Sequence, residues 1–246
     1  MFLAKARSKM EVINDINGDL VTFYRCVRFH QDPLLTELEF VLNSRKEFFD
    51  FRDQPGLTDI QRSSRWFFRN KNCFGGANMN SFGVGAAGGG SASHGSRASR
   101  MEAIRALSHR LDRVCIEHLD WQHCLRLYDR PGTFFFVDPP YTGCKADQYE
   151  AWTNTDVQIL RDRLFALKGK WLLTLNDTPA IRAIFSGCEF TPIARARGIN
   201  NKGGPSVIYR ELIIRPAQSS SGKIAVAPRL TTKRSAARRT IVRKSP

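Results

Sequence analysis

The chain has 246 residues, of which 42% are hydrophobic and 25% charged, so it is long and apolar enough to form one large α/β domain with a substantial core. A net charge of +15 favours a polyanionic partner, because lysines and arginines that neutralise phosphates release condensed counterions. No run of about 18 apolar residues is present, so we expect no membrane span, and the six cysteines lack zinc-site spacing, which predicts free thiols, no metal and a cytoplasmic protein.

The first part of the chain combines one strand with several helices. Residues 11–16 predict a strand that ends in an acidic turn. Residues 17–19, Asn-Gly-Asp, supply a break and a plausible N-cap, and apolar residues at helical spacing follow. Apolar series between residues 33 and 72 predict further helices. Residues 75–97 are rich in Gly, Ser, Ala and Asn, which predicts a long flexible loop. A helix is expected again at residues 102–111.

From residue 114 onward the pattern alternates between strands and helices, which predicts a doubly wound α/β sheet. Residues 134–137 are four apolar residues without alternation, which predicts a parallel strand covered on both faces. The other elements expected here are strands at 114–119 and 171–175, helices around 124–127, 154–167 and 178–185, and a closing pair of strands at 189–197 and 208–214.

The strongest chemical signal is the tetrapeptide Asp138-Pro139-Pro140-Tyr141. It follows a predicted strand directly, so it lies at the carboxyl end of the sheet, where open α/β sheets bind ligands. The two prolines restrict the backbone and remove two N–H donors, which leaves nearby carbonyls available to a substrate. The carboxylate can accept a hydrogen bond from an amino group, and the tyrosine ring can stack on a planar base. The alternative is a proline-terminated strand with a chance acid and aromatic.

This tetrapeptide resembles the (Asp/Asn/Ser)-Pro-Pro-(Tyr/Phe) motif of the amino-methyltransferases, and its Asp form is typical of Dam-like DNA adenine methyltransferases. The resemblance extends in order along most of the chain, up to Pro216. It implies a Rossmann-like methyltransferase sheet with a helical DNA-recognition insertion. The other matching segments are residues 13–20, which resemble the acidic motif after the second strand, residues 66–83, which resemble the DNA-recognition segment, Asp120-Trp121, and residues 175–177 and 211–214.

The resemblance also predicts how the chain is divided. That family carries a Phe-x-Gly-x-Gly loop after its first strand, which would lie before Glu11. Since only ten residues precede Glu11, the resemblance implies that the first strand is missing and predicts weak cofactor binding by this chain. The expected parts are a truncated start at 1–30, a helical DNA-recognition insertion with a Gly-rich loop at 31–105, a catalytic domain at 106–216 and a basic disordered tail at 217–246.

S-adenosylmethionine is the cofactor that the resemblance implies, with Asp15, Asp120 and Trp121 to hold it. Asp15 follows a predicted strand, where a carboxylate can accept hydrogen bonds from both ribose hydroxyls of a nucleoside. Asp120 could accept one from the adenine amine, with Trp121 packed on the adenine ring. The alternatives are a turn or N-cap role for each aspartate and a core position for the tryptophan.

Double-stranded DNA is the expected partner, bound by a monomer. The resemblance places Arg65, Arg69, Lys71 and Asn72 in the DNA-recognition segment, where the cations could contact phosphates. The alternative is an amphipathic helix with its aromatic residues in the core. Eight lysines and arginines and no acid follow Arg215, which favours non-specific DNA affinity of the tail, the alternative being a solubilising tail.

The mechanism implied is direct methyl transfer to the amine of an adenine flipped out of the duplex. Two other functions remain open. One is methylation of a different amine, on cytosine or RNA. The other is an inactive, truncated DNA-binding remnant. A Gly-x-Gly-x-x-Gly match at residues 83–88 is not interpreted as a nucleotide site, because no buried strand precedes it and no helix follows.

Overall fold

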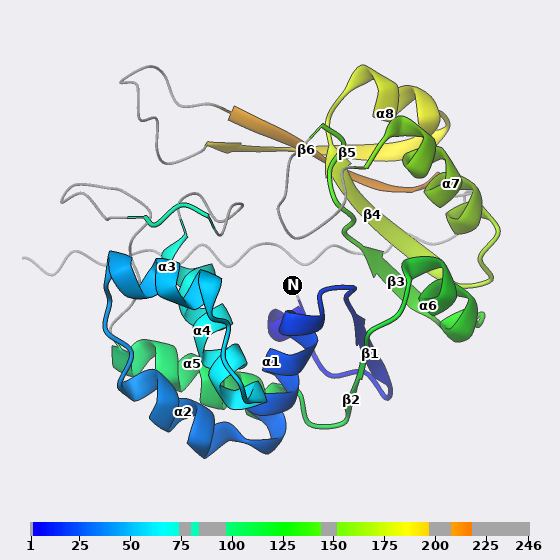
Figure 1. The fold of residues 1–246 in the computed structure, drawn as a ribbon. Helices are drawn as coiled ribbons and strands as arrows, with labels where there is room; N and C mark the ends of the chain where they lie inside the picture. The colour runs from blue at the N-terminus through cyan, green and yellow to red at the C-terminus, as the bar shows by residue number, and fades with distance from the viewer. Residues whose placement is uncertain (1, 74–79, 84–96, 144–151, 197–207, 218–246) are drawn as a thin grey trace, which may run out of the picture. The chain divides into compact units, whose positions relative to one another are not determined.

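The computed structural model describes residues 2–73, 80–83, 97–143, 152–196 and 208–217, which form a mixed α/β structure (Figure 1). Every strand and helix expected in these ranges is present, with ends shifted by a few residues. In chain order the elements are η1 (Phe2–Ala4), β1 (Glu11–Asn14), α1 (Gly18–Phe29), α2 (Gln31–Glu39), α3 (Arg45–Asp53), α4 (Asp59–Asn72), α5 (Arg97–Arg110), β2 (Val114–Glu117), α6 (Trp121–Tyr128), β3 (Phe134–Val137), α7 (Asn154–Phe165), β4 (Lys170–Asn176), α8 (Pro179–Ile184), β5 (Cys188–Ala196) and β6 (Ile208–Pro216).

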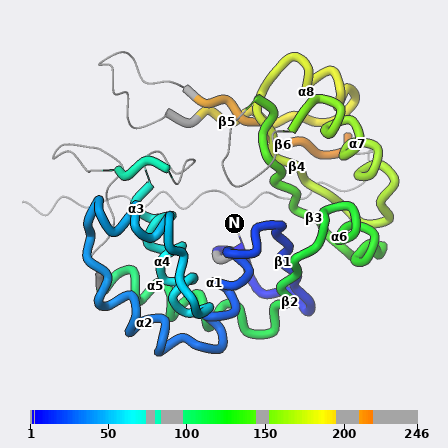
Figure 2. The backbone as a smooth tube through the Cα atoms, viewed as in Figure 1, coloured from blue at the N-terminus to red at the C-terminus, as the bar shows by residue number. Residues whose placement is uncertain are grey.

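The described strands form two sheets. In one, β1 pairs in parallel with β2, although the helices α1–α5 separate the two strands in the chain (Figure 2). The other has the order β3-β4-β6-β5, with β3 and β4 parallel and the remaining pairs antiparallel. Parallel pairs joined by helical crossovers are typical of α/β folds. A single doubly wound sheet is not confirmed, because no pairing joins β1 or β2 to the four-stranded sheet within the described residues.

Strand β3 is the edge of its sheet, and this corrects one expectation. Phe134 and Phe136 are 57% and 42% exposed, so the strand is not buried on both faces. Phe135 and Val137 point the other way and pack against the core of the four-stranded sheet. Exposed and covered side chains therefore alternate within this run of four apolar residues, because only one face of the strand packs against the core.

Three apolar clusters hold the described elements together. The four-stranded sheet packs against α7 and α8 through fully buried leucines such as Leu164, Leu173 and Leu175. A second cluster joins α1, α2 and α5 to β1 and β2 around Cys26, Val27 and Leu34. A smaller aromatic cluster lies between α3 and α4. Among the described residues, no helix is long and apolar enough to cross a membrane.

Local sequence signals explain where the helices begin. The Asn17 side chain caps α1 by accepting hydrogen bonds from the backbone N–H groups of Asp19 and Leu20, at 3.0 and 3.1 Å. Helix α7 begins with a capping box between Thr153 and Asp156. The expected boundary at residue 105 falls inside α5, while most of the Gly-rich loop and all but the first residue of the tail lie outside the described residues.

Candidate active site

The tetrapeptide leaves the sheet at the carboxyl end of β3. The last registered pair of β3 and β4 joins Val137 to Leu173, so Asp138 is the first residue beyond the ladder. Asp138 is exposed, whereas Pro139, Pro140 and Tyr141 are half-buried. The prediction that these residues follow a strand is therefore confirmed, and their carboxylate is accessible at the sheet edge where α/β proteins bind ligands.

The carboxylate of Asp138 contacts the neighbouring strand. The Oγ1 of Thr174 on β4 donates a hydrogen bond of 2.6 Å to Asp138 Oδ1. The same hydroxyl lies 3.4 Å from the carbonyl oxygen of Val137. Since β3 and β4 are parallel and adjacent, the contact continues their register by one residue beyond the last paired residues.

The residue after the tetrapeptide is also bound to β4. Thr142 Oγ1 donates to Asn176 Oδ1 at 3.3 Å, and Asn176 Nδ2 donates to the carbonyl oxygen of Thr142 at 3.1 Å. The ring of Tyr141 packs against the core of the four-stranded sheet. The chain between Asp138 and Thr142 thus has a hydrogen bond to β4 at each of its ends.

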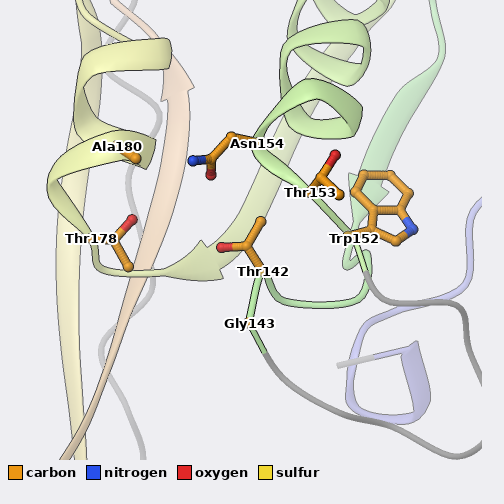
Figure 3. Close-up of a pocket in the computed structure, with 7 residues that line it drawn as sticks. All are labelled: Thr142, Gly143, Trp152, Thr153, Asn154, Thr178 and Ala180. Atoms are coloured by element: carbon orange, nitrogen blue, oxygen red, sulfur yellow. The ribbon is translucent and has the colours of Figure 1, made fainter.

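An open, solvent-facing cavity of about 410 Å³ lies beside this segment (Figure 3). Its volume lies within the range of roughly 300–1,000 Å³ found for small-ligand pockets. Three segments distant in sequence build it, namely the residues after Tyr141, the start of α7 and the start of α8, so sequence reasoning did not find it. The lining residues are Thr142, Gly143, Trp152, Thr153, Asn154, Thr178 and Ala180.

The two candidate cofactor aspartates follow paired strands. Asp15 comes directly after β1, and its backbone N–H donates to the carbonyl oxygen of Glu117, the last residue of β2, at 3.3 Å. Asp15 Oδ1 accepts from the backbone N–H of Asn17 at 2.8 Å. Because parallel strands end at the same edge, Asp15 and Asp120 both follow the carboxyl edge of this two-stranded sheet.

Asp120 and Trp121 have structural roles as well. Asp120 is the N-cap of α6, where its Oδ1 accepts from the backbone N–H groups of Gln122 and His123 at 2.9 and 3.2 Å. Trp121 lies 5.8 Å from Trp152, centroid to centroid, and packs against the core that Tyr141 also contacts. Asp120 therefore caps a helix and Trp121 packs against the core, as the alternative expects. Asp120 is nevertheless exposed to solvent.

Helix α4 carries the candidate DNA contacts, and its aromatic residues pack inward. Phe23 of α1 stacks on Phe67 at 5.3 Å and lies 5.4 Å from Trp66. Each of the three candidate cations lies over a ring. The ring contacts are Arg65 with Phe51 at 4.9 Å, Arg69 with Phe48 at 5.6 Å and Lys71 with Phe67 at 5.7 Å.

These cations differ in how accessible they are. Burial lowers the pKa of Arg69, and Arg65 donates to the backbone carbonyl of Gln54. Lys71 is exposed. The aromatic rings of α4 pack against neighbouring helices, as the amphipathic alternative expects, and contact of the cations with phosphates stays a prediction.

Asn72, the last of the four candidates, is not at the surface. Its side chain is 1% exposed and donates to the carbonyl oxygen of Phe68 at 2.8 Å, while its backbone carbonyl accepts from the N–H of Gly83 at 2.8 Å. A β-bridge between Cys73 and Phe82 lies next to this bond. In this conformation the Asn72 side chain has almost no exposed surface with which to contact DNA.

No metal or thiol chemistry is evident in the described part of the chain. Within it, no group of three or more His, Cys, Asp or Glu side chains could hold a metal ion. The cysteines described there are free thiols. Burial raises the pKa of Cys124 to about 11, so that thiol is protonated and a poor nucleophile at neutral pH.

Comparison with known proteins identifies a family to which this chain is similar. Residues 1–199 of the 246 match the model described as D12 class N6 adenine-specific DNA methyltransferase. The matched range contains β1, the cations of α4, the tetrapeptide and the cavity. No curated protein matches the chain.

Proposed function

The chain belongs to the D12 class of N6 adenine-specific DNA methyltransferases, and from this premise we propose that it transfers a methyl group from S-adenosylmethionine to the exocyclic amine of adenine in double-stranded DNA. The observation that carries the proposal is the exposed carboxylate of Asp138 in its Pro-Pro turn at the carboxyl end of β3. Electrostatic and positioning effects, rather than covalent catalysis, account for the rate.

Different residues of the tetrapeptide bind the two hydrogens of the target amine. The Asp138 carboxylate accepts one amino hydrogen and the carbonyl of Pro139 accepts the other. These two hydrogen bonds draw the nitrogen lone pair out of conjugation with the ring, which makes the nitrogen nucleophilic. Asp138 is also placed to take the proton that the amine loses. The ring of Tyr141 stacks on the flipped base and offsets part of the cost of unstacking it from the duplex.

The chain offers residues that fit the nucleoside end of S-adenosylmethionine, which supplies an electrophilic methyl group on a sulfonium centre. The donor chemistry matches because hydroxyl and amino groups are recognised by carboxylate acceptors. Asp15 would accept hydrogen bonds from the ribose hydroxyls and Asp120 from the adenine amine, and Trp121 would pack on the adenine ring. Their position after β1 and β2, at one edge of a parallel pair, supports this assignment.

DNA is held by cations that do not read sequence. Arg65, Arg69 and Lys71 on α4 neutralise phosphates, and the lysines and arginines after Arg215 add non-specific affinity. The net charge of +15 supports a polyanionic substrate.

The test is methylation of mixed-sequence duplex DNA by the purified chain, with modified nucleosides quantified by mass spectrometry. Because the resemblance predicts weak cofactor binding, the assay is run at S-adenosylmethionine concentrations raised to saturation. Under these conditions we expect N6-methyladenine from the parent and roughly a hundredfold less from Asp138→Ala. Asp162→Ala, an exposed aspartate on α7, is the matched control and should retain parental activity. Asp138→Ala should bind DNA as the parent does, since phosphate contacts are intact.

Other outcomes separate the alternatives. Formation of methylcytosine would show that cytosine, and not adenine, is the target base. Methylation of RNA in preference to DNA would show that RNA is the substrate. DNA binding without any transfer, under saturating S-adenosylmethionine, would identify the chain as an inactive binder. Activity of Asp138→Ala within about tenfold of the parent would remove Asp138 from the mechanism.

A further inference from the structure

We propose that Thr174 and Asn176 of β4 are positioning residues that hold the two ends of the tetrapeptide segment, Thr174 through the Asp138 carboxylate and Asn176 through Thr142. The inference rests on the proposed function, because it concerns the residues that would act on the adenine amine. The sequence analysis gave Thr174 no role and included Asn176 only in a segment that resembles the family, and neither residue belongs to the buried core.

The strand geometry brings these two side chains to one face. Alternate residues of a strand point to the same side, so Thr174 and Asn176 share a face while Leu173 and Leu175 point into the core, where both are fully buried. The core residues fix the strand and therefore fix the position of the two polar residues. Two polar side chains on a strand whose other face is buried can therefore hold a short catalytic segment in a fixed position.

The Thr174 hydroxyl restricts the orientation of Asp138. An exposed aspartate samples several side-chain rotamers, and only some of them direct a carboxylate oxygen at a bound amine. The hydrogen bond of 2.6 Å from Thr174 Oγ1 engages Oδ1 of Asp138. With Oδ1 held from behind, Oδ2 is presented to the substrate in a defined direction, which lowers the entropy lost when the amine is positioned.

Asn176 acts at the other end of the turn. Its amide both donates to the backbone carbonyl and accepts from the hydroxyl of Thr142, at 3.1 and 3.3 Å. Thr142 directly follows Tyr141 and lines the cavity shown in Figure 3. The paired hydrogen bonds therefore fix the backbone that carries the tyrosine ring and one wall of the cavity.

Thr174→Val is the decisive substitution, because valine keeps the β-branched shape and removes only the hydroxyl. We expect kcat to fall roughly 10- to 100-fold, with KM for DNA and for S-adenosylmethionine changed less than about threefold. Thr174→Ser restores the hydroxyl and should recover most of the lost kcat. Thr191→Val, an exposed threonine on β5, is the matched control and should behave as the parent.

A second readout does not need catalysis. The methyl resonance of Thr174 in an NMR spectrum should change position in Asp138→Asn, because the Thr174 hydroxyl then loses its carboxylate acceptor. The methyl resonance of Thr191 should not respond to that substitution. A Thr174 methyl group that does not respond to Asp138 would overturn the inference, whatever the activity of the chain.

The kinetic results also distinguish failure of the positioning role from failure of the proposed function. Parental kcat in Thr174→Val, a loss confined to KM, or a Thr174→Ser variant as impaired as the valine variant would each overturn the positioning role while the proposed function stands. A parent chain that methylates nothing overturns the proposed function instead, and the NMR comparison of the parent with Asp138→Asn then decides whether the two side chains are in contact.

Discussion

Glu11 and Arg110 form a buried ion pair between residues far apart in the sequence. Two arginine nitrogens donate to the two carboxylate oxygens, at 2.6 and 2.9 Å, and the side chains are only 7% and 11% exposed. Lys5 contacts the same carboxylate. Glu11 begins β1 and Arg110 ends α5, the helix before β2, so the pair links the beginning of one strand to the chain entering its partner.

Glu11→Gln should lower the melting temperature by several degrees at neutral pH, because it leaves the guanidinium of Arg110 largely buried beside a neutral amide. The Arg110 and Lys5 hydrogen bonds lower the pKa of Glu11 from 4.5 to about 2. The folded state therefore binds this proton less readily than the unfolded state. The stabilisation is complete above pH 4.5 and is lost as the pH falls toward 2.

Thermal melts between pH 2 and 7 check this prediction. The parent should lose stability more steeply below pH 4.5 than Glu11→Gln does. Asp162→Asn is the control, since its pair with Arg161 is exposed on both sides and should contribute little. Equal pH dependence in Glu11→Gln and the parent would contradict the role of this carboxylate.

Tyr141→Ala should lower kcat/KM for duplex DNA by roughly 5- to 150-fold, since stacking of a base on an aromatic side chain contributes about 1–3 kcal/mol. Tyr141→Phe keeps the ring and should retain most of the activity. Steady-state methylation kinetics of both variants give the comparison. If the phenylalanine variant is as impaired as the alanine variant, the hydroxyl rather than the ring is what the reaction needs.

Lys71→Ala should weaken DNA binding equally for all sequences and reduce the slope of log affinity against log salt by about 0.9, the value for one phosphate contact on B-DNA. Lys71 is preferred over Arg65 for this test, because Arg65 also supports the backbone at Gln54. The control is Lys168→Ala, which removes the same charge from an exposed lysine just before β4. An equal effect of both substitutions would mean that net charge alone determines the affinity.

Removal of residues 217–246 should also flatten the salt dependence of DNA binding, because eight lysines and arginines are lost without any acid. A full set of phosphate contacts would change the slope by roughly 7, so a smaller change measures the fraction of the tail engaged. A chain of the same length with these eight residues replaced by glutamine separates charge from length. An unchanged slope in both would show that the tail does not contact DNA.

Local patterns were sufficient for much of this protein. Caps such as Asn17 and apolar residues at helical or strand spacing predicted the elements, because these signals act over a few residues. The tetrapeptide could be recognised for the same reason, since its residue types and its place after a strand are both local. The resemblance to adenine methyltransferases followed from such segments in order, and the family match over residues 1–199 confirms it.

Tertiary structure decided what depends on neighbours across the chain. Only one face of β3 packs against the core, so Phe134 and Phe136 are exposed, and Asn72 is buried, although neither residue type nor spacing indicated it. The contact of Thr174 with Asp138 exists because β3 and β4 pair in a particular register, although α7 lies between the two strands in the chain. Register is a property of two strands at once, so a single segment of sequence cannot specify which side chain will lie beside a catalytic carboxylate.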